Sequence, residues 1–365
     1  MTPPGAPREA GSTRAQAPAF YVRPPGWLGS GSFSFEALAS WATHAEALGF
    51  DGIFVGDRLL SEATADGKVV YGASMLEASV VLAAIAARTE RVRLGPLVLV
   101  FAYRHPLQLA KSVATLDVVS GGRVVLGAGI GWNAREFEAL GVERAGRGRR
   151  FEESLDIVRA LWRGESVTRT GGTWELDDVR IDPVPVRPGG PPVWLASFSP
   201  GDPLEWSRGI PAGVRRVLDR VGRLADGWVP LIYSASGKRR LGADVLAAAW
   251  EEVGSSAERA GRGRGAVDFV FSDWCYVLDS PAAAERCREA VGRFFVGDWE
   301  DMVRTYSIGR PEQIVEQVEA QTVGVDRVDA YVLTPLSGEV DQLDQLAEHV
   351  VPMLRAARTR PEERL

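Results

Sequence analysis

The sequence predicts a closed (β/α)8 TIM barrel with loop insertions. Short apolar runs rich in valine and leucine recur along the chain, as expected of parallel strands that are buried on both faces. Each run is followed by a segment whose apolar residues fall at helical spacing. We count eight such units, a number that favours a closed barrel over an open doubly wound sheet. The length of 365 residues suits one barrel with insertions.

The clearest unit lies between residues 92 and 137. Residues 94–101 form an apolar run, interrupted only by a Gly-Pro pair, which predicts a buried strand. Residues 106–119 predict a helix, because a proline stands in the first turn and apolar residues follow at helical spacing. A Ser-Gly-Gly turn ends the helix, and residues 124–128 predict the next strand. This segment is therefore one complete strand–helix–strand unit.

The other units follow the same pattern in chain order. Short apolar runs predict strands over residues 20–22, 52–55, 192–196, 227–232, 267–278 and 328–334. Amphipathic spacing predicts helices over residues 35–48, 75–88, 133–140, 149–162, 214–224, 242–253, parts of 281–295, 311–321 and 342–357. Residues 165–191 carry several prolines and predict an excursion rich in β-turns.

Composition limits the classes of function. Hydrophobic residues make up 45% of the chain and charged residues 25%, which is ordinary for a globular protein. No apolar run approaches the length of a membrane span. A net charge of −6 argues against a nucleic-acid-binding surface. Residues 1–18 are rich in Pro, Gly, Ala and Ser and predict a disordered tail, and residues 19–365 predict a single barrel domain.

Cysteine and histidine are scarce. Cys275 and Cys287 are the only cysteines and have no metal-binding spacing, so we expect a reducing, cytoplasmic setting without a structural disulfide. The three histidines, His44, His105 and His349, are too few for a histidine-rich metal site. We therefore expect no metal.

The candidate site lies at the carboxyl ends of the strands, where barrels place their active sites. Four predicted strand ends carry informative residues. These are Asp57 and Arg58 after the second strand, residues 100–105 after the third, residues 127–133 after the fourth and residues 197–201 after the fifth.

Two of these ends suggest a bound cofactor. Gly127, Gly129 and Gly131 permit a tight turn, or they let a flat ring or a phosphate approach the backbone, and the spacing leaves both open. Ser197 and Ser199 suit a phosphate after a buried strand, although a simple turn is the plainer interpretation.

The other residues also have two interpretations. Asp57 and Arg58 form a salt bridge or a helix cap more often than a reacting pair. His105 orders the loop before a proline or transfers protons near neutral pH. Phe101 and Trp132 pack in the core or form the walls of an aromatic ligand site.

One long stretch resembles a known family. VRLGPLVLV…YRHPLQLAKSVATLDVVSGGRVVLGAGIGWNAREFEALGV closely resembles the bacterial luciferase-like flavin-dependent oxidoreductases. The resemblance covers about residues 35–357 and continues through GRRFEESLDIVRALW, PPVWLAS, RLADGWVPL, GRPEQIVEQV and VDAYVLTPL.

The resemblance implies a luciferase-like barrel that binds a flavin-type ring at the carboxyl face of the sheet. One branch uses reduced FMN with oxygen, and another uses the deazaflavin coenzyme F-420. It also implies a non-proline cis peptide at Val100-Phe101, behind the ring. The residues expected near the ring and its phosphate are Val100, Phe101, Gly129, Ile130, Gly131, Trp132, Ser197, Phe198 and Ser199.

The chain departs from the family pattern in two places. Arg58 stands where members commonly carry a histidine, and arginine cannot act as a general base near neutral pH. Arg58 would instead clamp an anionic substrate or stabilise a reduced, anionic flavin. Proton transfer would then fall to His105, Asp57 or water. The sequence SFSPGDP replaces the usual phosphate loop.

These observations favour a two-component monooxygenase, which takes reduced FMN from a flavin reductase and oxidises a small organic substrate with oxygen. The loop after the fifth strand is nearly uncharged, and no dense basic rim would suit the acidic tail of F-420. The basic candidates for such a rim are Arg104, Arg215, Arg216, Lys238, Arg239 and Arg240. An F-420-dependent hydride-transfer enzyme and a non-catalytic flavin-binding protein remain alternatives. The resemblance also implies a homodimer formed by the helices after strands two to four.

Overall fold

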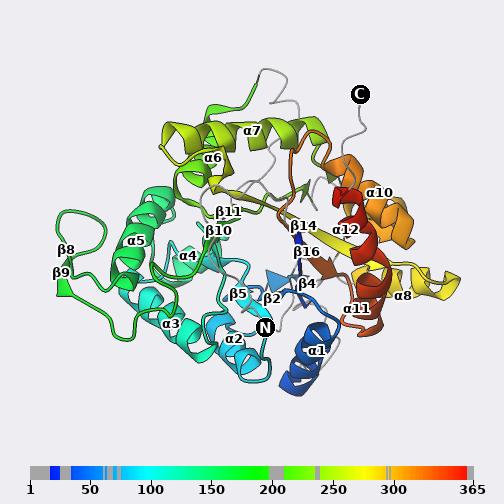
Figure 1. Ribbon diagram of the computed structural model, residues 1–365, viewed down its shortest axis with the longest axis horizontal. Helices are drawn as coiled ribbons and strands as arrows, with labels where there is room; N and C mark the ends of the chain where they lie inside the picture. The colour runs from blue at the N-terminus through cyan, green and yellow to red at the C-terminus, as the bar shows by residue number, and fades with distance from the viewer. Residues whose placement is uncertain are drawn as a thin grey trace.

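The computed structural model describes residues 17–24, 34–60, 62–63, 69–71, 75–196, 209–234, 239–292, 295 and 297–359, and the statements below concern these residues. Figure 1 shows strands at the centre and helices arranged around them, which is the layout of a barrel. The predicted tail lies outside the described residues, apart from residues 17 and 18. No described helix combines the length and the low polarity that crossing a bilayer requires.

The barrel has eight strand positions in the described part of the chain, and all pairings between them are parallel. A bridge between Leu94 and Val124 brings the two ends of the sheet together, so the predicted barrel is confirmed. The third position is divided in two at Leu97 and Val98. The strands are β1 (Ala19–Val22), β2 (Gly52–Val55), β5 (Arg93–Pro96) with β6 (Leu99–Val100), β7 (Leu126–Gly129), β10 (Val193–Leu195), β11 (Gly227–Trp228), β14 (Asp268–Val277) and β16 (Ala330–Pro335).

Helices surround this sheet (Figure 1). They are α1 (Phe35–Ala47), α2 (Ala78–Ala86), α3 (Pro106–Val119), α4 (Ala134–Ala139), α5 (Arg147–Trp162), α6 (Ala212–Leu224), α7 (Ala243–Arg259), α8 (Pro281–Gly292), α9 (Trp299–Thr305), α10 (Pro311–Gln321), α11 (Asp341–Gln345) and α12 (Val351–Thr359). A π-helical turn, η3 (Leu346–Val350), joins α11 to α12, and a 3-10 turn, η2 (Arg264–Ala266), precedes β14.

Several short strands lie outside the eight strand positions of the barrel. They form the antiparallel hairpins β3 (Glu62–Ala63) with β4 (Val69–Tyr71), β8 (Val167–Arg169) with β9 (Leu176–Val179), and β12 (Tyr233–Ser234) with β13 (Arg239–Arg240), while β15 (Ser307–Gly309) pairs with β14. The β8–β9 hairpin lies inside the predicted turn-rich excursion and projects outside the ring of helices (Figure 1).

Most predicted elements are confirmed, and two differ for local reasons. The strand predicted over residues 227–232 shortens to β11, because Pro230 follows and has no N–H group to donate to a ladder. The helix predicted over residues 242–253 continues to Arg259. The added residues pack closely on α6, since a Cβ added at Gly222 would lie 2.5 Å from Ser256 Cβ.

Aromatic side chains fill the barrel interior. Tyr21, Phe54 and Trp194 point inward from three strands, with ring centroids 5.2–5.4 Å apart. Glycine makes room for them and for the neighbouring backbone, since a Cβ at Gly95 would lie 1.8 Å from the carbonyl oxygen of Val125. The interior is therefore a packed core, with no room for a ligand among these side chains.

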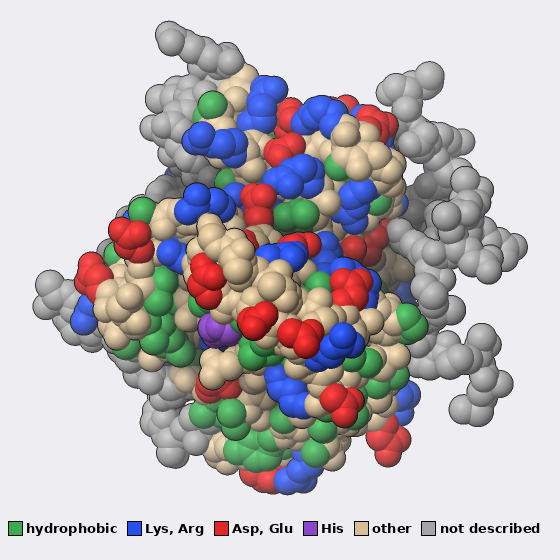
Figure 2. Space-filling model, turned by 90° about the vertical axis from the view of Figure 1, so that its left-hand side faces the viewer, with side chains coloured by type: hydrophobic (Ala, Val, Ile, Leu, Met, Phe, Trp, Pro, Cys, Tyr) green, Lys and Arg blue, Asp and Glu red, His purple; other side chains and the backbone are tan. Residues whose placement is uncertain are grey.

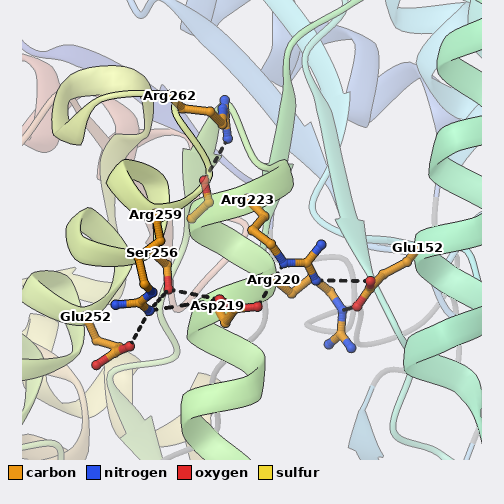
Figure 3. Close-up of polar contacts among 9 residues, drawn as sticks. Glu152, Asp219, Arg220, Arg223, Glu252, Ser256, Arg259 and Arg262 are labelled. Carbon is orange, nitrogen blue, oxygen red and sulfur yellow. Dashed lines mark hydrogen bonds and ion pairs between the residues drawn. The ribbon is translucent and has the colours of Figure 1, made fainter.

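An ion-pair network joins three outer helices (Figure 3). Glu152 of α5 accepts hydrogen bonds from Arg220 at 2.8 Å and Arg223 at 3.0 Å, both on α6. Asp219 of α6 accepts from Arg223 at 2.8 Å and lies 4.0 Å from Arg259 of α7. These groups are partly exposed, so each pair stabilises the fold only modestly. The network fixes how the helices are arranged on one side of the barrel.

Candidate active site

A small apolar surface lies at the carboxyl end of the barrel. Val98 and Ala196 pack on the interior core but remain partly exposed, and Gly129 lies between them. A Cβ at Gly129 would lie 2.7 Å from Val98 Cγ2 and 3.7 Å from the Ala196 carbonyl oxygen. We call these three residues the mouth floor. An apolar, partly exposed floor at the strand ends fits a flat aromatic ring such as a flavin.

The expected position of the cis peptide was wrong. The non-proline cis bond lies at Leu97-Val98, three residues before Val100-Phe101. The Gly95-Pro96 pair that interrupts the apolar run 94–101 directly precedes the cis bond, so the sequence marks where the strand breaks but not which peptide bond is cis. Phe101 is fully buried and contacts Phe151 of α5 at a centroid distance of 5.2 Å. The side chain of Phe101 therefore belongs to the core between the sheet and the helices.

The glycine turn after β7 is shaped by close packing. Gly131 has a φ of 75°, and a Cβ there would lie 2.7 Å from Val100 Cγ1 and 3.0 Å from the ring of Phe137. Ile130 is partly buried against the main core. These contacts match the interpretation that the glycines permit a tight, closely packed turn.

Arg58 and Trp132 come together at the mouth. The Arg58 guanidinium lies 5.2 Å from the centre of the Trp132 ring, and Arg58 Nε donates to the Leu60 carbonyl oxygen at 2.9 Å. The Trp132 side chain is exposed, at 60% of its full area. The sequence singled out both residues, from different strand ends, and the structure brings them into contact.

Asp57 forms a buried salt bridge. Its carboxylate accepts hydrogen bonds from both terminal nitrogens of Arg104, at 2.7 and 2.8 Å, and from the Val100 N–H at 3.1 Å. Burial raises the pKa of Asp57, and the Arg104 guanidinium offsets part of that rise. Burial disfavours the charge on Arg104, but Asp57 outweighs this and raises the pKa of Arg104. Asp57 thus connects the loop after β2 to the loop after β6.

A second buried carboxylate was missed by the sequence analysis. Glu136 of α4 is 5% exposed, and its Oε1 accepts from the Leu59 N–H at 2.9 Å and the Leu60 N–H at 3.2 Å. Its Oε2 accepts from the Tyr103 hydroxyl at 3.3 Å. Burial, followed by the charges of Asp57 and Glu136, raises the pKa of Tyr103 well above its usual range. Helical spacing alone could have placed Glu136 beside the buried Phe137 but not its partners.

Arg23 was also missed. It follows β1, and its guanidinium donates to the Leu97 carbonyl oxygen at 3.2 Å and lies 4.6 Å from the centre of the Trp274 ring. Strand alternation places it on the inward side, because Tyr21 points inward two residues earlier. That alternation is the signal that could have found it. Two arginines, Arg23 and Arg58, therefore lie at the strand ends, each over a tryptophan.

His105 lies on the outer side of this region. Its Nδ1 accepts from the Leu107 N–H at 3.2 Å, which caps α3, and its ring contacts Trp174, beside β9, at 4.8 Å. These contacts match the loop-ordering interpretation. Ser197, Phe198 and Ser199 lie outside the described residues. Among the residues that are described, no group of three or more His, Cys, Asp or Glu side chains could hold a metal ion.

Sequence comparison identifies the family. Residues 19–203, about half of the chain, match the luciferase-like monooxygenase family. The chain is 33% identical over 200 residues to 4-hydroxyprotoasukamycin monooxygenase of Streptomyces nodosus subsp. asukaensis, covering 54% of this chain and 50% of that protein. It is 31% identical over 227 residues to F420-dependent glucose-6-phosphate dehydrogenase of Amycolatopsis mediterranei (strain U-32), covering 61% and 60%. The chain thus spans only 50–60% of the length of these two relatives.

Solved structures show the same fold. Monooxygenase RslO1 from Streptomyces bottropensis matches with a TM-score of 0.70 at 22% identity, covering 92% of this chain and 99% of that one. An F420-dependent secondary alcohol dehydrogenase matches with a TM-score of 0.70 at 17% identity, covering 93% and 99%. The oxygenating constituent of 3,6-diketocamphane monooxygenase from Pseudomonas putida, solved with FMN, matches at 0.68 and 17%, covering 92% and 99%. The chain belongs to the luciferase-like monooxygenase family, which includes FMN-dependent monooxygenases and F420-dependent oxidoreductases.

Proposed function

We propose that the protein is a two-component monooxygenase, which takes reduced FMN from a separate flavin reductase and uses oxygen to oxidise a small organic substrate. The observation that carries this proposal is the state of the two carboxylates that follow strands β2 and β7. Asp57 is bound to Arg104 and Glu136 to two backbone N–H groups, so neither is placed to accept a proton from a substrate hydroxyl. Hydride transfer from an alcohol needs such a base, whereas oxygenation depends more on excluding water.

The chain's own residues have defined tasks in this proposal. The mouth floor of Val98, Gly129 and Ala196 would support the flat ring, with Ile130 and Gly131 beside it. Reduced FMN, when bound, would supply the electrons that activate oxygen. Arg23 and Arg58 would place positive charge near the anionic reduced ring, and their tryptophans would limit the access of water. Ser197, Phe198 and Ser199 would contact the phosphate, and proton exchange would pass through water, because His105 caps α3 on the outer side of the site.

Two of the six basic residues named for an acidic cofactor tail are held in internal salt bridges, which favours FMN. Arg104 is bound to Asp57, and Arg240 donates to the fully buried Asp273 at 2.6 Å. Both cations are therefore already neutralised by buried partners. A deazaflavin with an acidic tail would have to compete with these internal salt bridges.

The second candidate is an F-420-dependent hydride-transfer enzyme. It is favoured by the F420-dependent dehydrogenase relative, whose aligned region of 227 residues is longer than the 200 residues aligned with the monooxygenase. A non-catalytic flavin-binding protein is the third candidate, because Arg58 stands in place of the family's histidine. Cofactor binding without turnover would support that third candidate.

We also propose a homodimer that works in the cytoplasm. Exposed apolar side chains lie on helices after the second and third strand positions, including Val80 of α2 at 71% and Val119 of α3 at 57%. Figure 2 views the molecule from the left-hand side of Figure 1. In this view, hydrophobic side chains gather on the lower part of the molecule. Sedimentation should give a dimer for the wild type and a monomer for Val80→Glu, whereas a wild-type monomer would refute the dimer.

The free, buried Cys275 and Cys287 suit a reducing compartment.

The cofactor proposal is tested by titrating the purified protein without oxygen, once with reduced FMN and once with reduced F-420, and then admitting oxygen. We expect reduced FMN to bind and oxygen to produce a transient absorbance that is absent in free FMN. Preferential binding of F-420 without an oxygen-dependent transient would assign the protein to the hydride-transfer branch. Binding of neither cofactor would refute both enzyme proposals.

A further inference from the structure

We propose that Glu136 is a positioning residue, which sets Arg58 over Trp132 by holding the backbone of residues 59–60. The use of that arginine in binding a reduced, anionic cofactor rests on the proposed function. The placement of Arg58 by Glu136 does not, and it can be tested separately. Glu136 would itself touch neither cofactor nor substrate.

The contacts of Glu136 connect three loops at the barrel mouth. The residue lies in α4, directly after the glycine turn of β7, and its side chain is almost fully buried. One carboxylate oxygen accepts two successive backbone N–H groups, Leu59 and Leu60, from the loop after β2. The other accepts the Tyr103 hydroxyl from the loop after β6. A single carboxylate thus fixes the spacing of three strand ends.

The path from Glu136 to Arg58 has two steps. Glu136 fixes the Leu60 N–H at 3.2 Å, and the carbonyl oxygen of the same residue accepts from Arg58 Nε at 2.9 Å. That hydrogen bond sets the plane of the guanidinium, because Nε–H lies in the plane of the fork. The guanidinium then lies 5.2 Å from the centre of the Trp132 ring. Trp132 also lies two residues before α4, so the positions of Arg58 and Trp132 both depend on that helix.

Asp57 reinforces this arrangement without replacing it. It holds Arg104 and the Val100 N–H, so it joins the loops after β2 and β6 just before the segment that Glu136 holds. Among the described residues, the Asp57 carboxylate is engaged by Arg104 and the Val100 N–H, and Glu136 accepts from the backbone of residues 59–60. Glu136 is therefore a direct link between the loop that carries Arg58 and the helix that follows Trp132.

The experiment compares Glu136→Ala with Glu136→Gln and Glu138→Ala. Gln keeps an oxygen that can accept from both N–H groups, and Glu138 is an exposed carboxylate on the same helix, so both are matched controls. We expect Glu136→Ala and Arg58→Ala each to raise the Kd for reduced FMN about tenfold, because a small displacement of a binding group is costly. Adding Glu136→Ala to Arg58→Ala should raise the Kd no further. Additive losses would show a role that does not pass through Arg58.

A second readout needs no cofactor. In protein labelled with 5-fluorotryptophan, the Trp132 resonance is identified by its absence in Trp132→Phe. Arg58→Ala should shift it, Glu136→Ala should shift it to the same position, and Glu136→Gln and Glu138→Ala should leave it in place. The proposal would be overturned if the Trp132 resonance moved in Arg58→Ala but not in Glu136→Ala. It would also be overturned if the resonance did not move in Arg58→Ala. If reduced FMN fails to bind the wild type, the proposed function falls while this spectrum still decides the role of Glu136.

Discussion

At the residue scale, the candidate site combines residues that the sequence predicted with residues that it did not predict. Arg58 and Trp132 stand out because each follows a predicted strand, and the structure places them in contact. Glu136 and Arg23 act through backbone groups of distant loops, at separations of 76 and 74 residues. No local pattern encodes such pairings, since they depend on how the barrel brings strand ends together. Residue types at strand ends were therefore predictable, and their partners were not.

Replacing Arg58 should affect activity more than stability. Arg58→Ala removes the hydrogen bond to the Leu60 carbonyl and the contact with the Trp132 ring at a partly exposed position, so the free energy of unfolding should fall by about 1 kcal/mol. Turnover at limiting reduced cofactor should fall about tenfold, equivalent to about 1.4 kcal/mol of lost binding. Arg58→Lys keeps the charge but not the planar guanidinium, so its turnover should lie between those of the wild type and Arg58→Ala. Equal turnover in wild type and Arg58→Ala would remove Arg58 from the site.

Gly131 should resist substitution for two separable reasons. Gly131→Ala places a Cβ at positive φ and 2.7 Å from Val100 Cγ1, whereas Gly141→Ala meets a similar φ of 65° with nothing within 4 Å. The backbone cost alone is about 1–2 kcal/mol, and overpacking adds about 1–3 kcal/mol. Denaturant unfolding should therefore show a larger loss for Gly131→Ala than for Gly141→Ala. Equal losses would mean that the turn relaxes without cost.

At the scale of elements, strand and helix positions were predictable because apolar periodicity is a local property. The helix α3 and the strand β2 have their predicted bounds. The break at Leu97-Val98, the short β11 and the extension of α7 were not predicted, because packing between elements decides them. The small strand β15 is added alongside β14, where no apolar alternation announced it. Periodicity therefore locates elements, and tertiary contacts set their ends.

The junction between α1 and the loop before β5 should be sensitive to acid. Glu46 of α1 is partly buried, which opposes its charge, but the N–H groups of Glu90, Arg91 and Val92 outweigh burial and lower the pKa of Glu46 below its ordinary 4.5. A lowered folded-state pKa means that this stabilisation is present above about pH 4.5 and is lost as the pH falls through the folded value.

Glu46→Gln should therefore weaken the loss of stability below pH 4.5 while lowering stability at neutral pH. Thermal unfolding across that pH range measures both effects. Glu316→Gln, at an exposed position in α10, is the matched control and should reproduce the wild-type pH dependence. An unchanged acid profile for Glu46→Gln would show that the three N–H contacts do not hold in solution.

At the scale of the whole molecule, the barrel follows from counting eight apolar runs, and the barrel then dictates where a site can be. The packed interior of Tyr21, Phe54 and Trp194 excludes a ligand from the centre of the barrel, and barrels place their sites at the carboxyl face. The family resemblance in the sequence is confirmed by the match over residues 19–203. The choice between FMN and F-420 could not be made from the family, because its members divide between the two cofactors. That choice depends on side chains at the mouth, which the sequence does not place.

The most direct test of this account asks whether the mouth floor binds the cofactor. Wild type and Ala196→Phe are titrated with reduced FMN in the absence of oxygen, with thermal unfolding as the check on folding. Ala196 is partly exposed on the floor, so a phenyl group there should cover it with little effect on the core. We expect the wild type to bind reduced FMN and a folded Ala196→Phe variant not to bind it. Equal binding by both would place the cofactor elsewhere and contradict the account.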